Sequence, residues 1–196
     1  MRSNPFMDYS PKEWSTYKLG NLCSLEYGSY LPKKEMAGVG YPVFGANGII
    51  GYHTKCHYEK PMVGVSCRGE NSGKINMTPP KAFVTNNTIV CDKVDSDIVL
   101  DRYLYSCLQM VPRSRMVSGS AQPQVVIKDL KEVEVTLPNP AEQRRIADVL
   151  DTVDAAIRET DDVIAKQEQV KTGLLQDLLT RGLDANGRLR DPEANP

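Results

Sequence analysis

Two histidines and two cysteines lie close enough together in the sequence to suggest metal or thiol chemistry. His53, Cys56 and His57 fall within five residues, and Cys67 follows ten residues later. The H-x-x-x-H spacing suits zinc on a helix, whereas the residues around it are typical of turns and no C-x-x-C pair precedes it. Cys56 beside His57 could supply a nucleophile and its base, but such a pair needs a third group to position it. Turn and core roles are therefore expected, and a small thiol or zinc enzyme stays an alternative.

No other motif supplies catalytic or cofactor chemistry. The sequence contains no G-x-S-x-G, no P-loop and no Rossmann glycine pattern. The N-P-P-Y or D-P-P-Y motif of amino-methyltransferases is also missing, and Asn139-Pro-Ala-Glu142 resembles only its beginning. We therefore predict no catalytic residue, no metal site and no cofactor.

Four turn-rich segments carry side chains that could bind a nucleic acid. Lys and Arg can neutralise phosphates, Arg can read guanine, Asn and Gln can pair with adenine, and glycine lets the backbone approach a duplex closely. The plain alternative is that these polar turns are only solvated. The segments are residues 27–34, 47–55, 66–74 and 113–122.

The charge of the chain gives only weak support to nucleic-acid binding, because its 24 basic and 25 acidic residues leave a net charge of −1. The two halves differ, however. Through Pro138 there are 16 basic and 13 acidic residues, a net charge of +3, and from Asn139 onward 8 basic and 12 acidic residues, a net charge of −4. Only the first part is suited to a polyanion.

Composition and cysteine usage place the chain among ordinary globular proteins. Its 196 residues are 40% hydrophobic and 25% charged, which permits a real core. The five cysteines are odd in number and scattered, as expected for reduced thiols rather than a disulfide framework. No stretch approaches the roughly 18 apolar residues needed to span a bilayer, and residues 1–12 are polar without a signal-peptide core. A cytoplasmic protein with no membrane partner is expected.

The first region, from Trp14 to Pro138, reads as a turn-rich α+β domain. Asn47-Gly48 is a strong hairpin signal, because a type I′ turn needs positive φ at both central residues. Leu100, Tyr103, Leu104, Cys107 and Leu108 share one face of a predicted helix over residues 100–108. Short apolar runs between turn residues predict strands at residues 41–44, 49–50, 62–66, 82–85, 88–91 and 133–137.

A long helix begins sharply after this region. Asn139 is a suitable N-cap, Pro140 suits the first helical position, and Glu142 stands three residues after the cap. The helix is predicted to run to about Arg181, a length of roughly 60 Å, and to end at Gly182.

The long helix carries an apolar seam that is characteristic of a coiled coil. Of ten positions spaced by three or four residues, only Thr160, Gln167 and Lys171 are polar. A flanking column of Val149, Ala156, Val163 and Val170 widens the seam. A small domain cannot cover a seam of this length, so its partner is expected from another chain or from a part of a longer protein. The seven apolar seam residues are Ile146, Leu150, Val153, Ile157, Ile164, Leu174 and Leu178.

Taken in order, these segments resemble the specificity subunit of type I restriction-modification systems. Trp14-Ser-Thr-Tyr-Lys-Leu-Gly20 resembles the W-x-x-x-x-L-G opening of its target recognition domain, and Asn47-Gly-Ile-Ile-Gly-Tyr52 resembles its N-G-x-x-G-Y turn. Ser118-Gly-Ser-Ala-Gln-Pro123 resembles the G-x-x-Q-P segment near the end of that domain. Leu137–Leu150 resembles the L-P-P-x-x-E-Q-x-x-I-A-x-x-L start of the long helix, and Leu178–Asp184 its end.

The resemblance implies a non-catalytic reader of double-stranded DNA. It implies a target recognition domain over residues 1–138, a long helix over 139–182 for dimerisation and methyltransferase docking, and a polar tail or linker over 183–196. Methyltransferase subunits would dock on the helix and carry out adenine methylation with S-adenosylmethionine, and a restriction subunit would join the full complex. Complete members carry two recognition domains and two helices, so this chain is either a natural half-subunit or a fragment.

Two further expectations complete this interpretation. An antiparallel pair of identical helices centred near Asp162 would give a homodimer that reads a split inverted repeat, whereas pairing with full-length specificity chains, as a regulatory half-subunit, is the alternative. The DNA-binding surface is predicted to consist of Tyr30, Lys33, Lys34, Asn47, Tyr52, Arg68, Asn71, Lys74 and Gln122.

Overall fold

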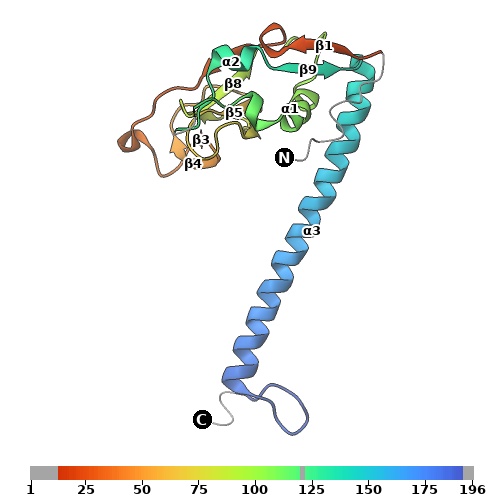
Figure 1. The fold of residues 1–196 in the computed structure, drawn as a ribbon. Coiled ribbons are helices and arrows are strands. Elements are labelled where there is room, and N and C mark those ends of the chain that lie inside the picture. Colours follow the sequence, from red (N-terminus) through yellow and green to blue (C-terminus); the bar gives the residue numbers. More distant parts are fainter. Residues whose placement is uncertain (1–12, 120–121, 192–196) are drawn as a thin grey trace. The chain divides into compact units, whose positions relative to one another are not determined.

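The computed structural model describes residues 13–119 and 122–191 (Figure 1). Residues 1–12, which the sequence predicts to be a polar N-terminus, lie outside the described part, as do residues 120–121 and 192–196. Contacts divide the chain into two compact units, Met1–Ala147 and Asp148–Pro196. This division falls after the predicted domain end at Pro138, because the first two turns of the long helix pack with the first unit.

The described part of the first unit contains three small β-sheets (Figure 1). Neighbouring strands pair antiparallel except β3 and β7, which are parallel. Together with the helices this makes an α+β fold, as the sequence predicts. In the order of their pairing, the strands are β1 (Ser15–Lys18) and β9 (Glu134–Leu137); β2 (Ser24–Tyr27), β8 (Thr88–Asp92), β5 (Val63–Ser66) and β6 (Ile75–Met77); and β4 (Gly48–His53), β3 (Tyr41–Gly45) and β7 (Phe83–Val84).

The β3–β4 hairpin exists, but the predicted type I′ turn is wrong. Gly45 pairs with Gly48, so the two central residues are Ala46 and Asn47 rather than Asn47 and Gly48. Among the described residues other than glycine, only Lys81 and Lys93 have positive φ, which excludes Asn47. Within this turn only Gly48 has a positive φ, of 130°. A glycine in this last position of a turn is also common, so the Asn-Gly pair located the hairpin without fixing its turn type.

The main hydrophobic core lies among the four-stranded sheet, β9 and two helices, α1 (Asp101–Met110) and α2 (Ile127–Lys131). The predicted face of α1 is confirmed, since Tyr103, Leu104 and Leu108 are buried and the other two members of that face pack partly buried against the same core. The described residues of this unit also form three short 3₁₀ helices: η1 (Leu19–Asn21), η2 (Lys33–Glu35) and η3 (Arg113–Arg115).

The long helix α3 (Pro140–Arg181) is confirmed as one uninterrupted element of 42 residues (Figure 1). Asn139 caps it as predicted, because the backbone N–H of Glu142 donates to Asn139 Oδ1 at 3.0 Å. At the other end Gly182 has a φ of 67°, and its N–H donates to the Leu178 carbonyl at 3.1 Å. This is the left-handed glycine cap that the sequence predicts.

Gln143, on the first turn of α3, is completely buried and joins three segments of the first unit. Its Oε1 accepts the Leu100 backbone N–H at 3.0 Å, at the start of α1. Its Nε2 donates to the carbonyls of Ile98 and Pro138, both at 2.8 Å. The side chain therefore satisfies backbone groups before α1 and after β9 while lying on α3.

The described part of the segment after α3, which the sequence predicts to be a polar tail or linker, forms a compact turn. Leu183 forms a bridge with Leu189, and the Asp184 N–H donates to the Arg188 carbonyl at 2.8 Å. Asp184 Oδ1 also accepts the backbone N–H groups of Asn186 and Arg188, at 2.8 and 2.9 Å. These hydrogen bonds and that of the Arg190 N–H with the Gly182 carbonyl, at 3.2 Å, hold the segment through Arg190.

Replacing Gln143 should destabilise the first unit strongly. Gln143→Ala leaves one buried and two partly buried backbone groups without this partner, and a fully buried group of this kind costs about 1–3 kcal/mol. The expected loss is about 3 kcal/mol or more in the free energy of unfolding, measured by urea denaturation. Arg145→Ala, at an exposed position two residues further along, is the matched control and should change stability by less than about 0.5 kcal/mol. Equal midpoints for the two variants would contradict this role of Gln143.

Candidate nucleic-acid interface

Three turns of the first unit meet at one place, and five of the nine predicted DNA-binding residues lie on them. We name this group the turn cluster. The turns are residues 45–48 between β3 and β4, residues 67–74 between β5 and β6, and the described residues 118–119 and 122–124 after η3. The five residues of the turn cluster are Asn47, Arg68, Asn71, Lys74 and Gln122.

The β5–β6 turn is closed by backbone hydrogen bonds at its base. The Ser66 N–H donates to the Lys74 carbonyl at 2.9 Å, and the Gly73 N–H donates to the Ser66 carbonyl at 2.7 Å. Gly73 has a φ of 83°, and an added Cβ would lie 2.8 Å from the Val117 side chain. Glycine is therefore required there by both conformation and space. The closed base presents Arg68 and Lys74 as exposed side chains.

Side-chain hydrogen bonds connect this turn to the other two. Lys74 Nζ donates to Asn47 Oδ1 on the β3–β4 turn. Ser72 Oγ donates to the Pro123 carbonyl at 2.7 Å, and the backbones of Arg68 and Gln124 form a bridge. Gln122 is exposed beside these contacts, although residues 120 and 121 lie outside the described part. The turns thus form one connected polar surface.

Arg113 belongs to this surface and is absent from the residues predicted to bind DNA. Its Nη2 donates to the Glu70 carbonyl, and a Cβ added to Gly73 would lie 3.0 Å from its Cγ. The sequence signal was the polar segment 113–122 itself. Only the tertiary contact shows that Arg113, on η3, approaches the β5–β6 turn.

The other four predicted residues lie outside the turn cluster, Tyr52 on β4 and the other three on the segment that precedes β3. Tyr30, Lys33 and Lys34 are exposed on the segment that contains η2. This segment is joined to β4 where the Ala37 N–H donates to the Tyr52 carbonyl at 2.7 Å. The sequence-predicted surface is therefore two groups, of which the turn cluster is the more highly connected.

The side chains of the turn cluster, together with Arg113, suit a polyanion whose bases expose hydrogen-bonding groups. Arg68, Lys74 and Arg113 supply positive charge, and Asn47, Asn71 and Gln122 supply amides that can donate and accept. Basic groups can hold phosphates, while Arg and the amides can form paired hydrogen bonds with bases.

The histidines pack on an aromatic ring in the first unit. The His53 and His57 rings lie 4.8 and 4.0 Å from the ring of Phe83, centroid to centroid. Burial, followed by the charge of His53, lowers the pKa of His57. Within the described residues no group of three or more His, Cys, Asp or Glu side chains could hold a metal ion.

The thiols of Cys56, Cys91 and Cys107 have raised pKa values, which favour the protonated form. Burial, with Glu59 3.5 Å from the sulfur, raises the pKa of Cys56, and burial raises the pKa of Cys107 to about 11. The neighbouring Cys23 thiol and burial raise the pKa of Cys91. Because the thiolate is the reactive form, these shifts oppose nucleophilic chemistry near pH 7.

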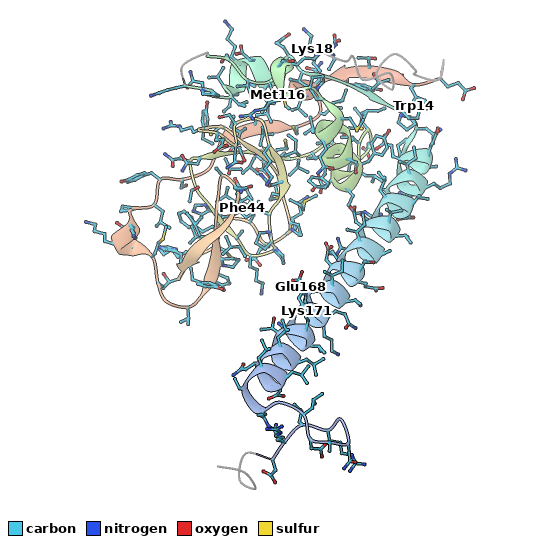
Figure 2. All side chains as sticks on the ribbon, turned by 60° about the horizontal axis from the view of Figure 1, so that its bottom comes forward. Trp14, Lys18, Phe44, Met116, Glu168 and Lys171 are labelled. Carbon is cyan, nitrogen blue, oxygen red and sulfur yellow. The ribbon has the colours of Figure 1, made fainter. Side chains whose placement is uncertain are left out.

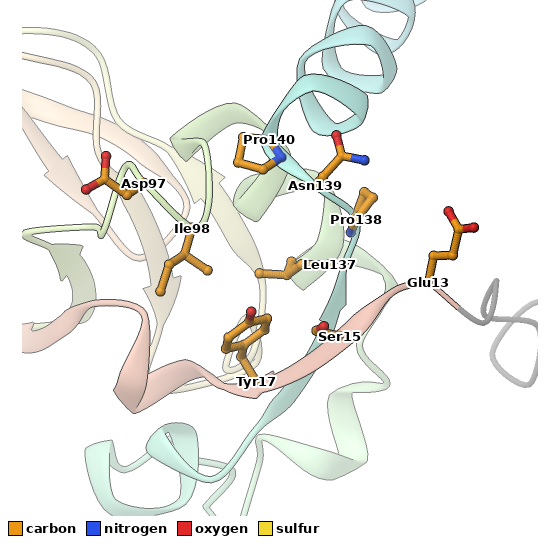
Figure 3. Close-up of a pocket in the computed structure, with 9 residues that line it drawn as sticks. All are labelled: Glu13, Ser15, Tyr17, Asp97, Ile98, Leu137, Pro138, Asn139 and Pro140. Carbon is orange, nitrogen blue, oxygen red and sulfur yellow. The ribbon is translucent and has the colours of Figure 1, made fainter.

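A separate pocket of about 220 Å³ lies where α3 begins (Figure 3). Tyr17 and Leu137 project into it from β1 and β9, with Asp97 on one side and Glu13 on the other (Figure 3). None of the predicted DNA-binding residues lines it. Its two carboxylates make it a poor site for a polyanion.

The seam of α3 is exposed beyond the first unit. Side chains such as Glu168 and Lys171 project outward from the helix (Figure 2). Ile146 differs from the other seam residues because it packs partly buried against the main core. The remaining six predicted interface residues, Leu150, Val153, Ile157, Ile164, Leu174 and Leu178, are 39–53% exposed.

Comparison with known proteins identifies the family. The family model described as the type I restriction modification DNA specificity domain matches residues 11–167, which is most of the chain. The chain therefore belongs to the family of type I restriction-modification DNA specificity domains, as the sequence motifs suggest. The described helices include none long and apolar enough to cross a membrane.

Individual relatives agree with this family. The type I restriction enzyme EcoprrI specificity subunit of Escherichia coli is 25% identical over 142 residues, which cover 69% of this chain and 35% of that protein. The fold is similar to the S subunit of M. genitalium, with a TM-score of 0.71 and 21% identity over 84% of this chain and 45% of that one. It is also similar to the HsdS subunit of Thermoanaerobacter tengcongensis, with a TM-score of 0.58 and 20% identity over 89% of this chain and 47% of that one.

A third structure, from work on assembly and conformational transition of a type I restriction-modification system, has a TM-score of 0.66 and 22% identity. The alignment covers 92% of this chain and 48% of that one. The chain thus spans about a third of the curated relative and just under half of the structural relatives.

Proposed function

We propose that this chain is a sequence-specific DNA-binding specificity subunit, which directs methyltransferase and restriction subunits of a type I complex to a bipartite DNA target. The observation that carries the proposal is the turn cluster, where basic and amide side chains from three turns are connected into one surface. Family membership gives this surface its expected ligand, double-stranded DNA.

In this proposal the chain reads DNA and the chemistry belongs to its partners. The methyltransferase subunit binds S-adenosylmethionine and methylates adenine, so the chain itself needs no cofactor or catalytic residue. The raised thiol pKa values and the packed histidines support this division, because they give the nucleophile and metal-ligand candidates structural roles. The acidic second region offers its exposed seam for assembly.

The exposed apolar seam of α3 is the reason to propose a homodimer. Two copies would supply two recognition domains and two long helices, which is the number in a complete specificity subunit. A parallel, in-register pair would place Lys171 against Lys171 and Gln167 against Gln167. An antiparallel pair centred near Asp162 places Lys171 against Val153 and Leu150 against Leu174, so that the lysine stem packs and its amine reaches solvent.

The same exposed seam also suits a regulatory half-subunit that pairs with full-length specificity chains. In that case the second helix and the second recognition domain come from the longer chain, and the DNA target has two unrelated halves. A homodimer instead requires two related halves in inverted orientation, since a two-fold axis repeats one reading surface.

Methyl transfer to DNA should depend on the partner. The purified chain alone should transfer no methyl group from radiolabelled S-adenosylmethionine, and adding a type I methyltransferase subunit of the same organism should give methylation at a fixed sequence. The methyltransferase alone is the control. Robust methylation by the isolated chain would refute the proposal.

Arg68 should contribute to recognition of one base pair. Arg68→Ala is expected to cost about 1–3 kcal/mol on the cognate duplex and to relax the preference at one position, measured by competition binding. Lys18→Ala removes a charge from β1, where Lys18 pairs with Glu132, and is the matched control with unchanged binding. An equal loss on every sequence would make Arg68 a phosphate contact, and no loss would remove it from the interface.

The dimer should depend on the apolar seam. Leu150→Asp with Leu174→Asp places a charge at two facing positions, so light scattering should report monomers while circular dichroism shows a folded first unit. Thr152→Asp with Gln169→Asp lies off the seam and should leave the dimer intact. A wild-type chain that is monomeric at high micromolar concentration would overturn the prediction.

A further inference from the structure

The tip of the β3–β4 hairpin exposes two adjacent isoleucines. Ile49 and Ile50 are 55% and 52% exposed, whereas Val43 and Phe44 on the paired strand are buried. Two neighbouring strand residues normally point to opposite faces, so one of them would usually be covered. Here both remain accessible at the same end of the hairpin.

A β-bulge explains how Ile50 comes to be presented. Val43 pairs with Gly51 and Phe44 with Ile49, which leaves Ile50 as an extra residue on β4. A Cβ added to Gly45 would lie 3.0 Å from Ile50 Cγ2, so the missing side chain of Gly45 makes room for the isoleucine. Bulges often redirect a side chain toward a functional surface.

The backbone beneath these isoleucines is held by side chains of the four-stranded sheet. Thr88 Oγ1 donates to the Gly45 carbonyl at 3.1 Å. Ser66 Oγ donates to the Ala46 carbonyl, which Asn76 Nδ2 also approaches at 3.4 Å. The tip is therefore anchored at two successive carbonyls, and its apolar side chains are presented from a fixed base.

The surroundings of the tip favour DNA over a protein as the partner. Asn47, on the same turn, accepts the hydrogen bond from Lys74, which continues into the turn cluster with Arg68 and Arg113. An apolar tip bordered by cationic side chains is complementary to a DNA groove. The phosphates along the groove attract the cations, and an apolar group on its floor can contact the isoleucines. The major groove of B-DNA admits a two-stranded β-ribbon, and its one apolar marker is the thymine C5-methyl group.

We infer that Ile49 and Ile50 are specificity-determining residues that contact thymine methyl groups in the major groove. This inference rests on the proposed function and names the base feature that the hairpin tip reads. Hydrogen-bonding side chains of the turn cluster cannot detect a methyl group, so the isoleucines add information that those side chains lack.

The test removes only the thymine methyl groups. The full chain, assembled with the methyltransferase subunit of the same organism, is used to select its binding site from a random duplex pool. The selected duplex is then made with deoxyuridine replacing thymidine, one position at a time. Wild-type protein should bind about fourfold more weakly for each contacted methyl lost, the worth of one buried methylene-sized group.

Variants of the hairpin tip test whether Ile49 and Ile50 cause the weaker binding to the deoxyuridine duplex. Ile49→Ala with Ile50→Ala should weaken binding to the thymidine duplex and abolish the difference between thymidine and deoxyuridine. Met110→Ala, which trims an equally exposed apolar side chain at the end of α1, is the matched control and should keep both affinity and discrimination.

The outcomes separate this inference from the proposed function. Selective binding by the wild-type protein with equal affinity for thymidine and deoxyuridine duplexes overturns the inference and leaves DNA reading intact; this comparison needs no variant. Discrimination that survives in the double variant also overturns it. If the double variant loses only methyltransferase assembly in size-exclusion chromatography, the tip is a protein contact and the inference fails. No selected sequence at all refutes both.

Discussion

One buried amide bonds the start of α3 to the rest of the first unit. Gln143 satisfies backbone groups at Leu100, Ile98 and Pro138, so the start of α3 is bonded to the segments that lead into α1 and out of β9. Pro138 directly follows β9, which pairs with β1, so the hydrogen bond to its carbonyl lies at the end of this two-stranded sheet. Loss of the amide would leave unsatisfied polar groups in the core, which cost more than the hydrogen bonds contribute.

Beyond this junction the helix has a different physical character. Its first two turns are packed by the first unit, and Ala147 is the last residue of α3 that is buried. The following seam residues stay about half exposed, and helix propensity alone does not account for the regular spacing of these apolar side chains. A second helix is the simplest surface with a matching apolar repeat, and this is why assembly stands at the centre of the proposed function.

The sequence predicted those features that depend on local patterns. The caps at Asn139 and Gly182, the uninterrupted helix between them and the buried face of α1 all follow from short-range spacing. The turn type at Asn47 failed because the pairing of Gly45 with Gly48 shifts the turn by one residue. The grouping of the turn cluster, the role of Arg113 and the buried state of Gln143 depend on contacts across distant parts of the chain, which no local pattern contains.

In the β3–β4 hairpin, the residues that stabilise the backbone differ from those whose side chains are exposed at the tip. Ser66, Asn76 and Thr88, which lie on strands of the four-stranded sheet, hold the backbone of the tip by hydrogen bonds. The isoleucine side chains at positions 49 and 50 take no part in these bonds. Substitutions at exposed positions usually change stability by less than about 0.5 kcal/mol. Substitutions at the tip are therefore expected to leave the frame intact, and under the inference that the tip contacts DNA a lineage could acquire a new target without first passing through an unstable protein.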